Sequence, residues 1–437
     1  MNVLHVIPSI SALEGGPSLA VKSMAEALAR EHVQVTIATT AAAQSAAVIG
    51  DQLSVNGEET RKEDRSSTER EGAGGSDRGY RVICFRREFE PYKISFGLAR
   101  WLRENVGKFD LVHVHALFSF SSTLAARIAR RNNVPYIVRP LGVLNRWGMQ
   151  NRRRLPKKIS FQYLELPILL SAAAIHYTSE AERNEVAELN QQLAEHESAV
   201  IPLPIEQGAW SKELATASPS SGGQGAESGQ QFFGMFPRAQ GKRIILFLSR
   251  IDQKKGLELL IDAFAMVREK NKDVALVIAG DGEESYVREL RERARRNLRS
   301  GSASGSACPT NAEEEGAVIW TGHLSGEMKA AALAAADIFV LPSASENFGI
   351  AAAESLAAGV PTIVSEEVAL SDEIRRYDAG VVVQRDVQQL ADAISDLLSN
   401  GERAAALAAN GRRLVEERYS PQAVGRALHE LYQKLIT

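Results

Sequence analysis

Cysteine is scarce in this chain of 437 residues, in which the two cysteines, Cys84 and Cys308, lie far apart. This scarcity excludes a disulfide framework and a CxxC metal site, and it is typical of proteins from a reducing compartment. Long apolar runs are missing too, because the most apolar stretch, 164–175, is interrupted by a glutamate, a proline and a serine. The sequence therefore predicts no membrane-spanning helix.

An excess of charge of one sign is also missing. Lysine and arginine number 51 and aspartate and glutamate 54, which gives a net charge of −3. This near-balance argues against a dedicated nucleic-acid binder. The first residues, MNVLHVIPSI, lack a basic segment and include a proline, so we expect a buried strand there rather than a signal peptide. Together these absences predict a cytoplasmic protein, and its length predicts more than one domain.

What the sequence has in abundance is an alternation of short β-branched runs with longer amphipathic stretches. This alternation is typical of α/β domains with parallel sheets. Strands are expected at 3–7, 33–39, 81–85, 111–114, 136–139, 174–177 and 199–201, and again at 243–248, 274–279, 318–320, 338–341, 362–364 and 380–383. Helices are expected at 17–30, 122–131 and 421–436, among others. Because the rhythm restarts in the second half, we expect two such domains.

Three segments poor in large apolar side chains interrupt this pattern, at 56–78, 216–230 and 299–311. Their charged, glycine-rich or serine-rich compositions cannot form a core, so we expect them to lie outside the domains and to carry no chemistry. The predicted division is an N-terminal domain at 1–210, a flexible linker at 211–240, a C-terminal domain at 241–420 and a closing helix at 421–437.

Two loops carry residues suited to binding phosphate. Gly15 and Gly16 follow the first strand and open a helix, whose exposed N–H groups attract anions, although such a turn is more often only structural. Arg250 ends a strand and Lys255 precedes a glycine and a helix, at the sheet edge where open α/β folds bind ligands. These two cations could neutralise a diphosphate leaving group, and a solvated basic loop is the alternative.

Two glutamates lie close together in the second half of the chain. Glu346 is in a strand-to-helix loop, and Glu354 is inside the following helix, which is thin because it is rich in alanine. Both carboxylates could accept hydrogen bonds from sugar hydroxyls, and two unrelated glutamates are the alternative. The sequence contains no Asp-x-Asp motif that would hold a metal ion.

The stretch 139–158 carries seven cations and no acidic residue. The cations are Arg139, Arg146, Arg152, Arg153, Arg154, Lys157 and Lys158. Such a local field could attract a lipid-diphosphate acceptor or an anionic membrane surface, and a solvated helix is the alternative. Arg139 ends a strand, so it is the cation expected to reach a binding cleft most readily.

These motifs, in this order and at these intervals, resemble a known family. They are Gly15-Gly16, the HVHALFS segment with His113 and His115, Arg250 with Lys255-Gly256, and Glu346 with Glu354. Together they resemble the retaining, nucleotide-sugar-dependent glycosyltransferases of group 1, also called family 4, over the chain apart from its three inserts. The resemblance implies the GT-B fold, in which two Rossmann-like parallel-sheet domains face each other across a cleft and the closing helix crosses back to the N-terminal domain.

The resemblance also implies residue roles. Those near the reaction are His115, Arg250, Lys255 and Glu346, and those that bind the donor are Gly15, Gly16, Gly322, His323, Leu324, Phe348, Gly349 and Glu354. In these roles Arg250 and Lys255 hold the diphosphate, Glu346 contacts the sugar, and Glu354 contacts the ribose. The segment 322–324 would cradle the nucleobase. His113 is expected to face the other side of the strand from His115.

The chemistry implied by the resemblance is a front-face transfer from a nucleotide sugar to a hydroxyl acceptor, without a metal or other cofactor. The acceptor would be a glycan or a lipid-linked intermediate of cell-envelope polysaccharide synthesis, and the protein would be cytoplasmic, at the inner face of the membrane. No nucleic acid takes part. Two alternatives stay open: another enzyme of this fold, such as a sugar-nucleotide epimerase, and a catalytically silent binding subunit.

Overall fold

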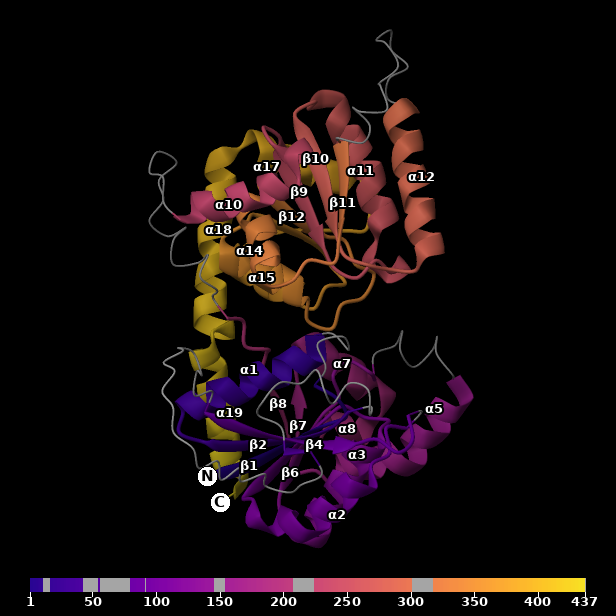
Figure 1. The fold of residues 1–437 in the computed structure, drawn as a ribbon, viewed down its shortest axis with the longest axis vertical. Coiled ribbons are helices and arrows are strands. Elements are labelled where there is room, and N and C mark those ends of the chain that lie inside the picture. The colour runs from indigo at the N-terminus through magenta and orange to yellow at the C-terminus, as the bar shows by residue number, and fades with distance from the viewer. Residues whose placement is uncertain are drawn as a thin grey trace, which may run out of the picture. The chain divides into compact units, whose positions relative to one another are not determined.

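The computed structural model describes residues 1–10, 16–41, 54–55, 79–90, 92–144, 154–206, 224–300 and 317–436. They form two compact units, which we describe separately (Figure 1). The N-terminal unit consists of Met1–Pro204 and Pro421–Thr437, and the C-terminal unit is Ile205–Ser420.

A parallel sheet forms the centre of the N-terminal unit. Its described strands are β1 (Asn2–Ile7), β2 (Gln34–Ala41), β3 (Ser54–Val55), β4 (Tyr80–Arg86), β5 (Leu111–His115), β6 (Tyr136–Arg139), β7 (Ala174–Tyr177) and β8 (Ser198–Val200). They are ordered β3-β4-β2-β1-β5-β6-β7-β8. The strand order reverses at β1, so the topological switch point, where open α/β sheets bind ligands, lies between β1 and β5.

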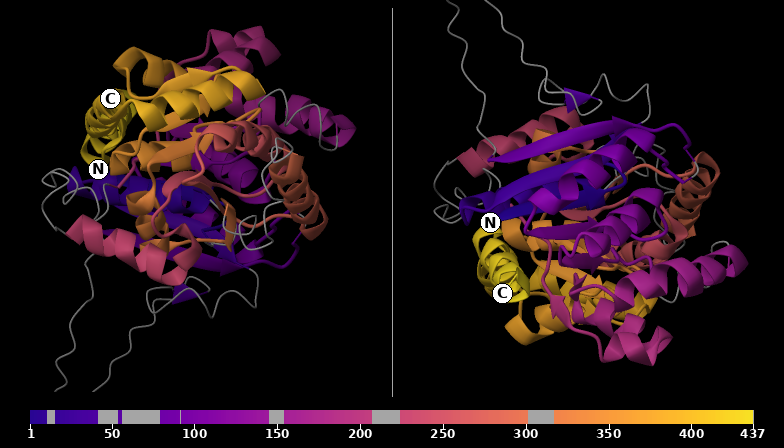
Figure 2. Two further views of the ribbon diagram at one scale, coloured as in Figure 1. Left: turned by 90° about the horizontal axis from the view of Figure 1, so that it is seen from above. Right: turned by 90° about the horizontal axis from the view of Figure 1, so that it is seen from below.

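Helices cover both faces of this sheet. They include α1 (Gly16–Arg30), α2 (Phe96–Asn105), α3 (Phe120–Arg131), α5 (Arg154–Ser160), α6 (Leu166–Leu170), α7 (Glu180–Leu189), α8 (Gln191–Ala194) and α19 (Pro421–Ile436). One apolar core joins the sheet to α2, α3, α6 and α7, and a second joins its other face to α1 and α19. The two termini lie side by side, and α19 packs on α1 (Figure 2). Gly425 permits this contact, because a Cβ there would lie 2.7 Å from the carbonyl oxygen of Ala27.

The C-terminal unit repeats this architecture. Its described strands are β9 (Arg243–Leu248), β10 (Val274–Ala279), β11 (Val318–Gly322), β12 (Ile338–Leu341), β13 (Thr362–Ser365) and β14 (Val381–Val383), ordered β11-β10-β9-β12-β13-β14. Its helices include α10 (Gln224–Met235), α11 (Leu257–Lys270), α12 (Glu284–Ser300), α14 (Gly326–Ala335), α15 (Ile350–Ala358), α16 (Ser371–Tyr377), α17 (Val387–Ser399) and α18 (Gly401–Leu414). Here the switch point lies between β9 and β12.

The predicted strands are confirmed, because each lies within two residues of an observed one. Strands of a parallel sheet are buried on both faces, so their β-branched runs leave a strong signal. The two-residue β3 was not predicted, since a segment that short has no periodicity.

The prediction that 211–240 is a flexible linker is wrong for its second half. This region contains α10, where Phe232 is fully buried and its ring lies 5.0 Å from that of Phe236. Phe232 gives α10 a buried apolar side, and this helix packs on α14, although the composition around it is rich in glycine and serine. The insert at 56–78 and residues 301–311 of the third insert lie outside the described residues.

Candidate active site

The loops that follow β9 and β12 touch each other at the switch point of the C-terminal sheet. Gly256, just before α11, has φ +70°, and a Cβ there would lie 2.1 Å from the carbonyl oxygen of Pro342. The N–H of Ala344 donates to the carbonyl of Lys254 at 2.6 Å. Only glycine fits this left-handed, crowded position, so the contact explains the glycine after Lys255.

Lys255 and Glu346 form an ion pair where these two loops meet. Lys255 ends a short 3-10 helix, Gln253–Lys255, and its Nζ donates to Oε2 of Glu346. Lys255 is 5% exposed, and the Glu346 side chain is partly buried. Two residues that the sequence analysis placed in one site are therefore in direct contact, and partial burial strengthens their attraction.

Further cations surround this pair. Arg250 is exposed, and Lys254 is partly buried. Burial lowers the pKa of Lys254, the charges of Lys255 and Arg250 lower it further, and the carboxylate of Glu346 opposes them. Arg250, Lys254 and Lys255 therefore interact with one another, and the carboxylates of Glu346 and Asp252 oppose them. This excess of positive charge favours the binding of an anion.

Two helices begin at this edge without a side-chain cap. Gly256 before α11 and Gly349 before α15 have φ of +70° and +90°, and neither supplies a capping side chain. By contrast, Ser95, Ser119 and Ser179 accept hydrogen bonds from the first turns of α2, α3 and α7. The first N–H groups of α11 and α15 are thus left to bind an anion, assisted by the helix dipole.

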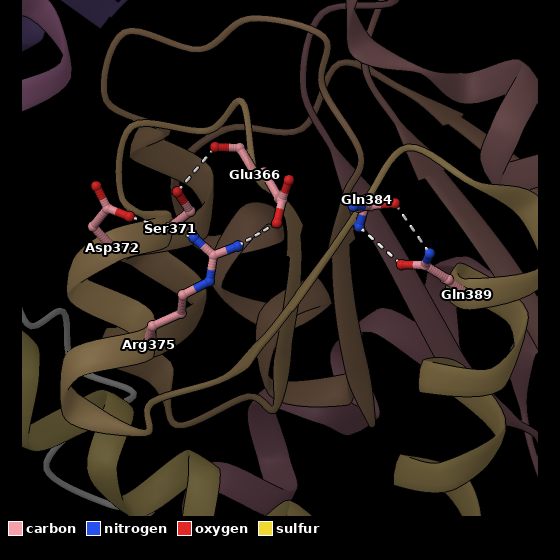
Figure 3. A network of polar contacts seen from close by, with 6 residues as sticks. All are labelled: Glu366, Ser371, Asp372, Arg375, Gln384 and Gln389. Atoms are coloured by element: carbon pink, nitrogen blue, oxygen red, sulfur yellow. Dashed lines mark hydrogen bonds and ion pairs between the residues drawn. The ribbon is translucent and has the colours of Figure 1, made fainter.

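The loop that carries Glu346 is held by its neighbour. The N–H of Glu346 donates to this neighbouring loop, 366–369, at 3.2 Å, and its carbonyl accepts from the same loop at 3.1 Å. Figure 3 shows how α16 anchors that loop: Arg375 bonds the Glu366 carboxylate at 2.6 Å, and the Ser371 hydroxyl donates to the Glu366 carbonyl at 3.0 Å. A glutamine pair in the same figure ties the next loop to α17.

Glu354, the predicted ribose contact, lies on α15 and is paired with a lysine. Its Oε1 accepts a hydrogen bond from Nζ of Lys329 on α14 at 2.6 Å, and both side chains are partly buried. The sequence analysis did not identify Lys329. The sequence feature that could have identified Lys329 is a single cation within an otherwise alanine-rich helix.

The predicted donor-binding residues 322–324 and 348 belong to the same unit. Gly322 ends β11 with φ +72°, and its carbonyl accepts from the N–H of Gly280 at 2.8 Å. His323 is exposed and Leu324 is partly buried. The side chain of Phe348 is buried edge-on against the ring of Tyr419 at 5.4 Å, which leaves its backbone for a ligand.

In the N-terminal unit, His115 ends β5 at the switch point, and its ring stacks on that of His113 at 4.2 Å. The expectation that His113 faces the other side is therefore wrong. Side chains alternate along a strand with period two, so residues i and i+2 share a face. Gly16 begins α1, and Gly15 lies outside the described residues.

His115 belongs to a buried cluster that the sequence analysis missed. Its other histidines are His5, His113 and His176, and all four are 0% exposed. Burial lowers the pKa of His5 and of His176 to about 3 and the pKa values of the other two well below their usual range, with the charge of Arg139 adding to the effect. The sequence feature that could have identified this cluster is the presence of histidines within strands that are predicted to be buried.

Three of these rings are close enough to share a metal ion. Nitrogens of His5, His113 and His115 lie within 4.8 Å of one another, the only such group among the described residues. Each ring already makes hydrogen bonds, and the buried cation of Arg139 opposes a second positive charge. The surroundings therefore favour a neutral, hydrogen-bonded cluster.

The expectation that Arg139 belongs to a cleft-facing or membrane-facing patch is wrong, because this residue is 1% exposed. Its guanidinium lies 3.1 Å from Sδ of Met24 and donates to the Thr178 hydroxyl at 3.3 Å. The carboxylate of Glu182, also buried, provides the opposite charge nearby. Arg139 points into the face of the sheet that α1 covers.

The rest of the basic run is divided. Arg146, Arg152 and Arg153 lie outside the described residues, and Arg154 begins α5. Lys157 donates to the carbonyl of Val143 at 3.0 Å and lies 4.9 Å above the ring of Phe118. Lys158 is exposed, next to Ile159 at 56% exposure and near Tyr163 at 73%. No described helix is both long enough and apolar enough to cross a membrane.

A cavity of about 810 Å³ lies elsewhere in the C-terminal unit, against α10, α12 and β11. Its lining includes Arg291 and Trp320, whose groups stack at 5.3 Å, and none of the predicted site residues. The cavity is therefore separate from the Lys255–Glu346 site.

Family models match both halves of the chain. A "Glycosyl transferase 4-like domain" matches residues 15–204, and "Glycosyl transferases group 1" matches residues 242–400. The chain belongs to the group 1 glycosyltransferases. This confirms the family that the sequence motifs resemble.

Curated relatives agree with this assignment. The uncharacterized glycosyltransferase YqgM of Bacillus subtilis is 26% identical over 63% of this chain and 74% of its own length. An alpha-monoglucosyldiacylglycerol synthase of Streptococcus pneumoniae is 32% identical over 45% of this chain and 40% of its own. A phosphatidyl-myo-inositol mannosyltransferase of Mycobacterium leprae is 30% identical over 45% of this chain and 47% of its own length. The chain thus matches less than half the length of these last two relatives.

Solved structures share the fold of the whole chain. Anabaena Alr3699/HepE in complex with UDP has a TM-score of 0.70 at 14% identity, and the match covers 99% of this chain and 100% of that one. Sucrose-phosphate synthase from Thermosynechococcus elongatus has a TM-score of 0.65 at 20% identity, covering 99% and 98%. The predicted fold class, two Rossmann-like parallel-sheet domains of the GT-B type, is confirmed.

Proposed function

We propose that this group 1 glycosyltransferase moves a sugar from a nucleoside-diphosphate sugar to a hydroxyl acceptor, with retention of anomeric configuration and without a metal ion. The observation that carries the proposal is the Lys255–Glu346 pair, which lies between two uncapped helix N-termini at the switch point of the C-terminal sheet. Support comes from Anabaena HepE, a protein of this fold whose structures are complexes with UDP and with UDP-glucose.

The positive groups at this site act on the leaving phosphate. As the bond to the anomeric carbon breaks, negative charge builds up on the diphosphate, and preorganised cations stabilise it most in the transition state. Arg250 is suited to a bidentate contact with two phosphate oxygens, and Lys255 is suited to a contact with one. The N–H groups at the start of α11 and α15 are suited to bind the remaining phosphate oxygens. Since the sequence has no Asp-x-Asp motif, we assign this work to side chains and helix ends.

Both candidate carboxylates are held by lysines, which argues against a nucleophilic role. Glu346 is paired with Lys255 and Glu354 with Lys329, whereas retaining two-carboxylate enzymes need a carboxylate free to attack the sugar. We therefore assign retention to a front-face reaction. The acceptor hydroxyl attacks the anomeric carbon from the side on which the phosphate leaves, and the departing phosphate oxygen takes the hydroxyl proton. Glu346 orients the donor sugar and Lys255.

We propose a lipid-linked acceptor in cell-envelope glycan synthesis, reached by reversible docking on an anionic membrane from the cytoplasm. The relatives from Streptococcus and Mycobacterium bear the names of lipid-modifying enzymes. In this chain, exposed Lys158 is close in sequence to exposed Ile159 and Tyr163 around α5. A cation attracts anionic headgroups, and exposed apolar side chains can enter the interface.

A donor screen tests this function. The purified chain is incubated with UDP-, GDP- and ADP-sugars, with diacylglycerol, phosphatidylinositol or a polyprenyl diphosphate as acceptor, in excess EDTA. We expect one donor to be consumed and its α-configured sugar to appear in the product, as measured by NMR. A product whose anomeric configuration is opposite to that of the donor would contradict retention, and activity lost in EDTA and restored by magnesium or manganese would contradict metal independence. If no donor is hydrolysed or transferred, the proposed function is wrong.

A further inference from the structure

Four buried histidines and one tyrosine in the N-terminal unit form an unbroken chain of hydrogen bonds. In order, the pairs are Ile201 O with His176 Nε2 at 2.7 Å, His176 Nδ1 with His113 Nε2 at 3.2 Å, His113 Nδ1 with the Tyr432 hydroxyl at 2.7 Å, that hydroxyl with His5 Nε2 at 3.2 Å, and His5 Nδ1 with His115 Nε2 at 3.2 Å. We call these five side chains the histidine–tyrosine relay. Its members come from β1, β5, β7 and α19.

The carbonyl of Ile201 sets the direction of the first half of the relay. A carbonyl only accepts, so Nε2 of His176 must carry its proton, and Nδ1 of this neutral ring is an acceptor. His113 therefore donates to it from Nε2 and is itself an acceptor at Nδ1. The hydroxyl of Tyr432 must then donate its proton to His113.

The same reasoning continues to the other end. Having donated its one proton, the Tyr432 oxygen accepts from Nε2 of His5. Nδ1 of His5 then accepts from Nε2 of His115. This leaves Nδ1 of His115 without a proton, and the atom is buried and has no hydrogen-bond partner in the part of the chain that the structure describes.

The relay needs neutral rings, and its surroundings provide them. Burial lowers the pKa of all four histidines, and the buried cation of Arg139 disfavours a further positive charge. Burial raises the pKa of Tyr432, so its hydroxyl stays protonated. Glu182 is the carboxylate near Arg139, and its own pKa is raised by burial.

We propose that the histidine–tyrosine relay holds His115 in a single tautomer, protonated at Nε2, with Nδ1 kept as a hydrogen-bond acceptor at the carboxyl end of β5. The four other relay members act as positioning residues. To move its proton to Nδ1, His115 would have to reverse every hydrogen bond in the chain, and the carbonyl of Ile201 would then face a bare nitrogen.

A fixed acceptor selects its ligand by hydrogen-bonding chemistry. Although Nδ1 of His115 is buried, any ligand group that reaches it must donate a hydrogen bond, as a hydroxyl does, because an oxyanion has no proton to give. This selection, but not the tautomer itself, rests on the proposed function, in which the ligand is rich in hydroxyls.

The tautomers can be measured directly by ¹⁵N NMR on the full chain labelled in histidine. In the wild type, we expect all four buried rings to be protonated at Nε2. Tyr432→Phe removes one hydroxyl and breaks the relay between His113 and His5. In this variant, His176 and His113 should keep their tautomer, because Ile201 still orders them, whereas His5 and His115 should populate both forms.

Tyr136→Phe is the matched control. It also removes a buried hydroxyl in the same unit, one that donates to the carbonyl of Ile168 at 2.8 Å, but it lies outside the relay. All four histidines should keep their tautomers in this variant. If the Tyr432 variant does not fold, His176→Phe removes the anchor at Ile201 and should release the tautomers of the three remaining histidines.

The NMR measurement needs no substrate, so its outcome is independent of the proposed function. A wild-type His115 protonated at Nδ1, or His5 and His115 unchanged after the relay is broken, would overturn the inference. Where sugar transfer is detected, Tyr432→Phe should lower kcat about tenfold at unchanged donor KM, and Tyr136→Phe should leave both within about twofold. Equal kcat in the two variants would contradict the positioning role.

Discussion

The switch points of the two sheets offer opposite chemistry. In the C-terminal unit, the loops after β9 and β12 carry the charged pair Lys255 and Glu346 and the exposed Arg250. In the N-terminal unit, β1 and β5 themselves carry His5, His113 and His115, which are fully buried and neutral. The same fold thus provides positive charge at one edge and a neutral hydrogen-bond acceptor at the other.

The comparison indicates which of the two sites also contributes to the stability of the fold. The charged site is built on loops that depend on glycines and backbone contacts, so its side chains can change without loss of core packing. The histidine cluster is part of the core between the sheet, α1 and α19. We therefore expect substitutions at the first site to change mainly kinetics, and substitutions at the second to change the free energy of unfolding as well.

The largest expected effect concerns the charged site. Arg250→Ala and Lys255→Ala should each lower kcat by a factor of at least about one hundred, the scale of one lost preorganised contact. The melting temperature of Arg250→Ala should stay near that of the wild type because Arg250 is exposed, whereas Lys255→Ala should lower it because the partly buried Glu346 loses its partner. Lys270→Ala, an exposed cation at the other end of α11, is the control and should leave kcat unchanged. Near-normal kcat in both site variants would mean that the diphosphate binds elsewhere.

Acid should destabilise the N-terminal unit more than the C-terminal unit. The folded pKa values of His5 and His176 are about 3 against 6.5 when unfolded, so below pH 6.5 the unfolded chain binds more protons and stability falls as the pH falls. Burial raises the pKa of Glu165 and of Glu182, which opposes this loss, but four histidines outweigh two carboxyls. We expect a loss on the order of several kcal/mol in the N-terminal unit between pH 7.5 and pH 5.

Hydrogen exchange measured strand by strand checks this expectation. The C-terminal unit contains one histidine, His323, which is exposed, and serves as the internal control. Protection should fall in β1 and β5 and persist in β9 and β12. Equal loss of protection in the two units would contradict the assignment of acid sensitivity to the buried histidines.

The two glutamates of the charged site should differ in kinetics. Glu354→Ala should raise the donor KM about tenfold, because a ribose contact is present in the ground and transition states alike. Glu346→Ala should mainly lower kcat, because it removes a contact to the sugar that moves and orients Lys255. Calorimetry with the bare nucleoside diphosphate gives the check: equally weak binding by both variants would contradict this division of roles.

The smallest expected effect concerns the membrane-docking surface of the N-terminal unit. Lys158→Gln should weaken sedimentation with anionic vesicles about fivefold, since one cation near such a surface contributes about 1 kcal/mol. Lys270→Gln in the C-terminal unit is the control. Binding should also fade from 0.1 M to 1 M salt, as the Debye length falls from about 10 Å to 3 Å. Sedimentation with vesicles that is independent of both salt concentration and lipid charge would exclude electrostatic docking.

The sequence by itself determined the local structure and half of the candidate site. Strand ranges followed from β-branched runs, because a strand of a parallel sheet is covered on both faces and therefore consists mostly of apolar residues. Lys255 and Glu346 were identified from their loops and motif spacing, since both lie just after a predicted strand. The helix α10 was missed because a sequence rich in glycine and serine surrounds its aromatic residues.

Only the tertiary structure decided which of these residues meet. Lys255 and Glu346 are 91 residues apart, and His5 and Tyr432, which share a hydrogen bond, are 427 apart. The periodicity of a strand or helix shows which of its sides is buried, but the element that covers that side is set by strand order and long-range packing. Arg139 illustrates this: it is the first cation of an acid-free basic stretch, yet the fold buries it beneath α1.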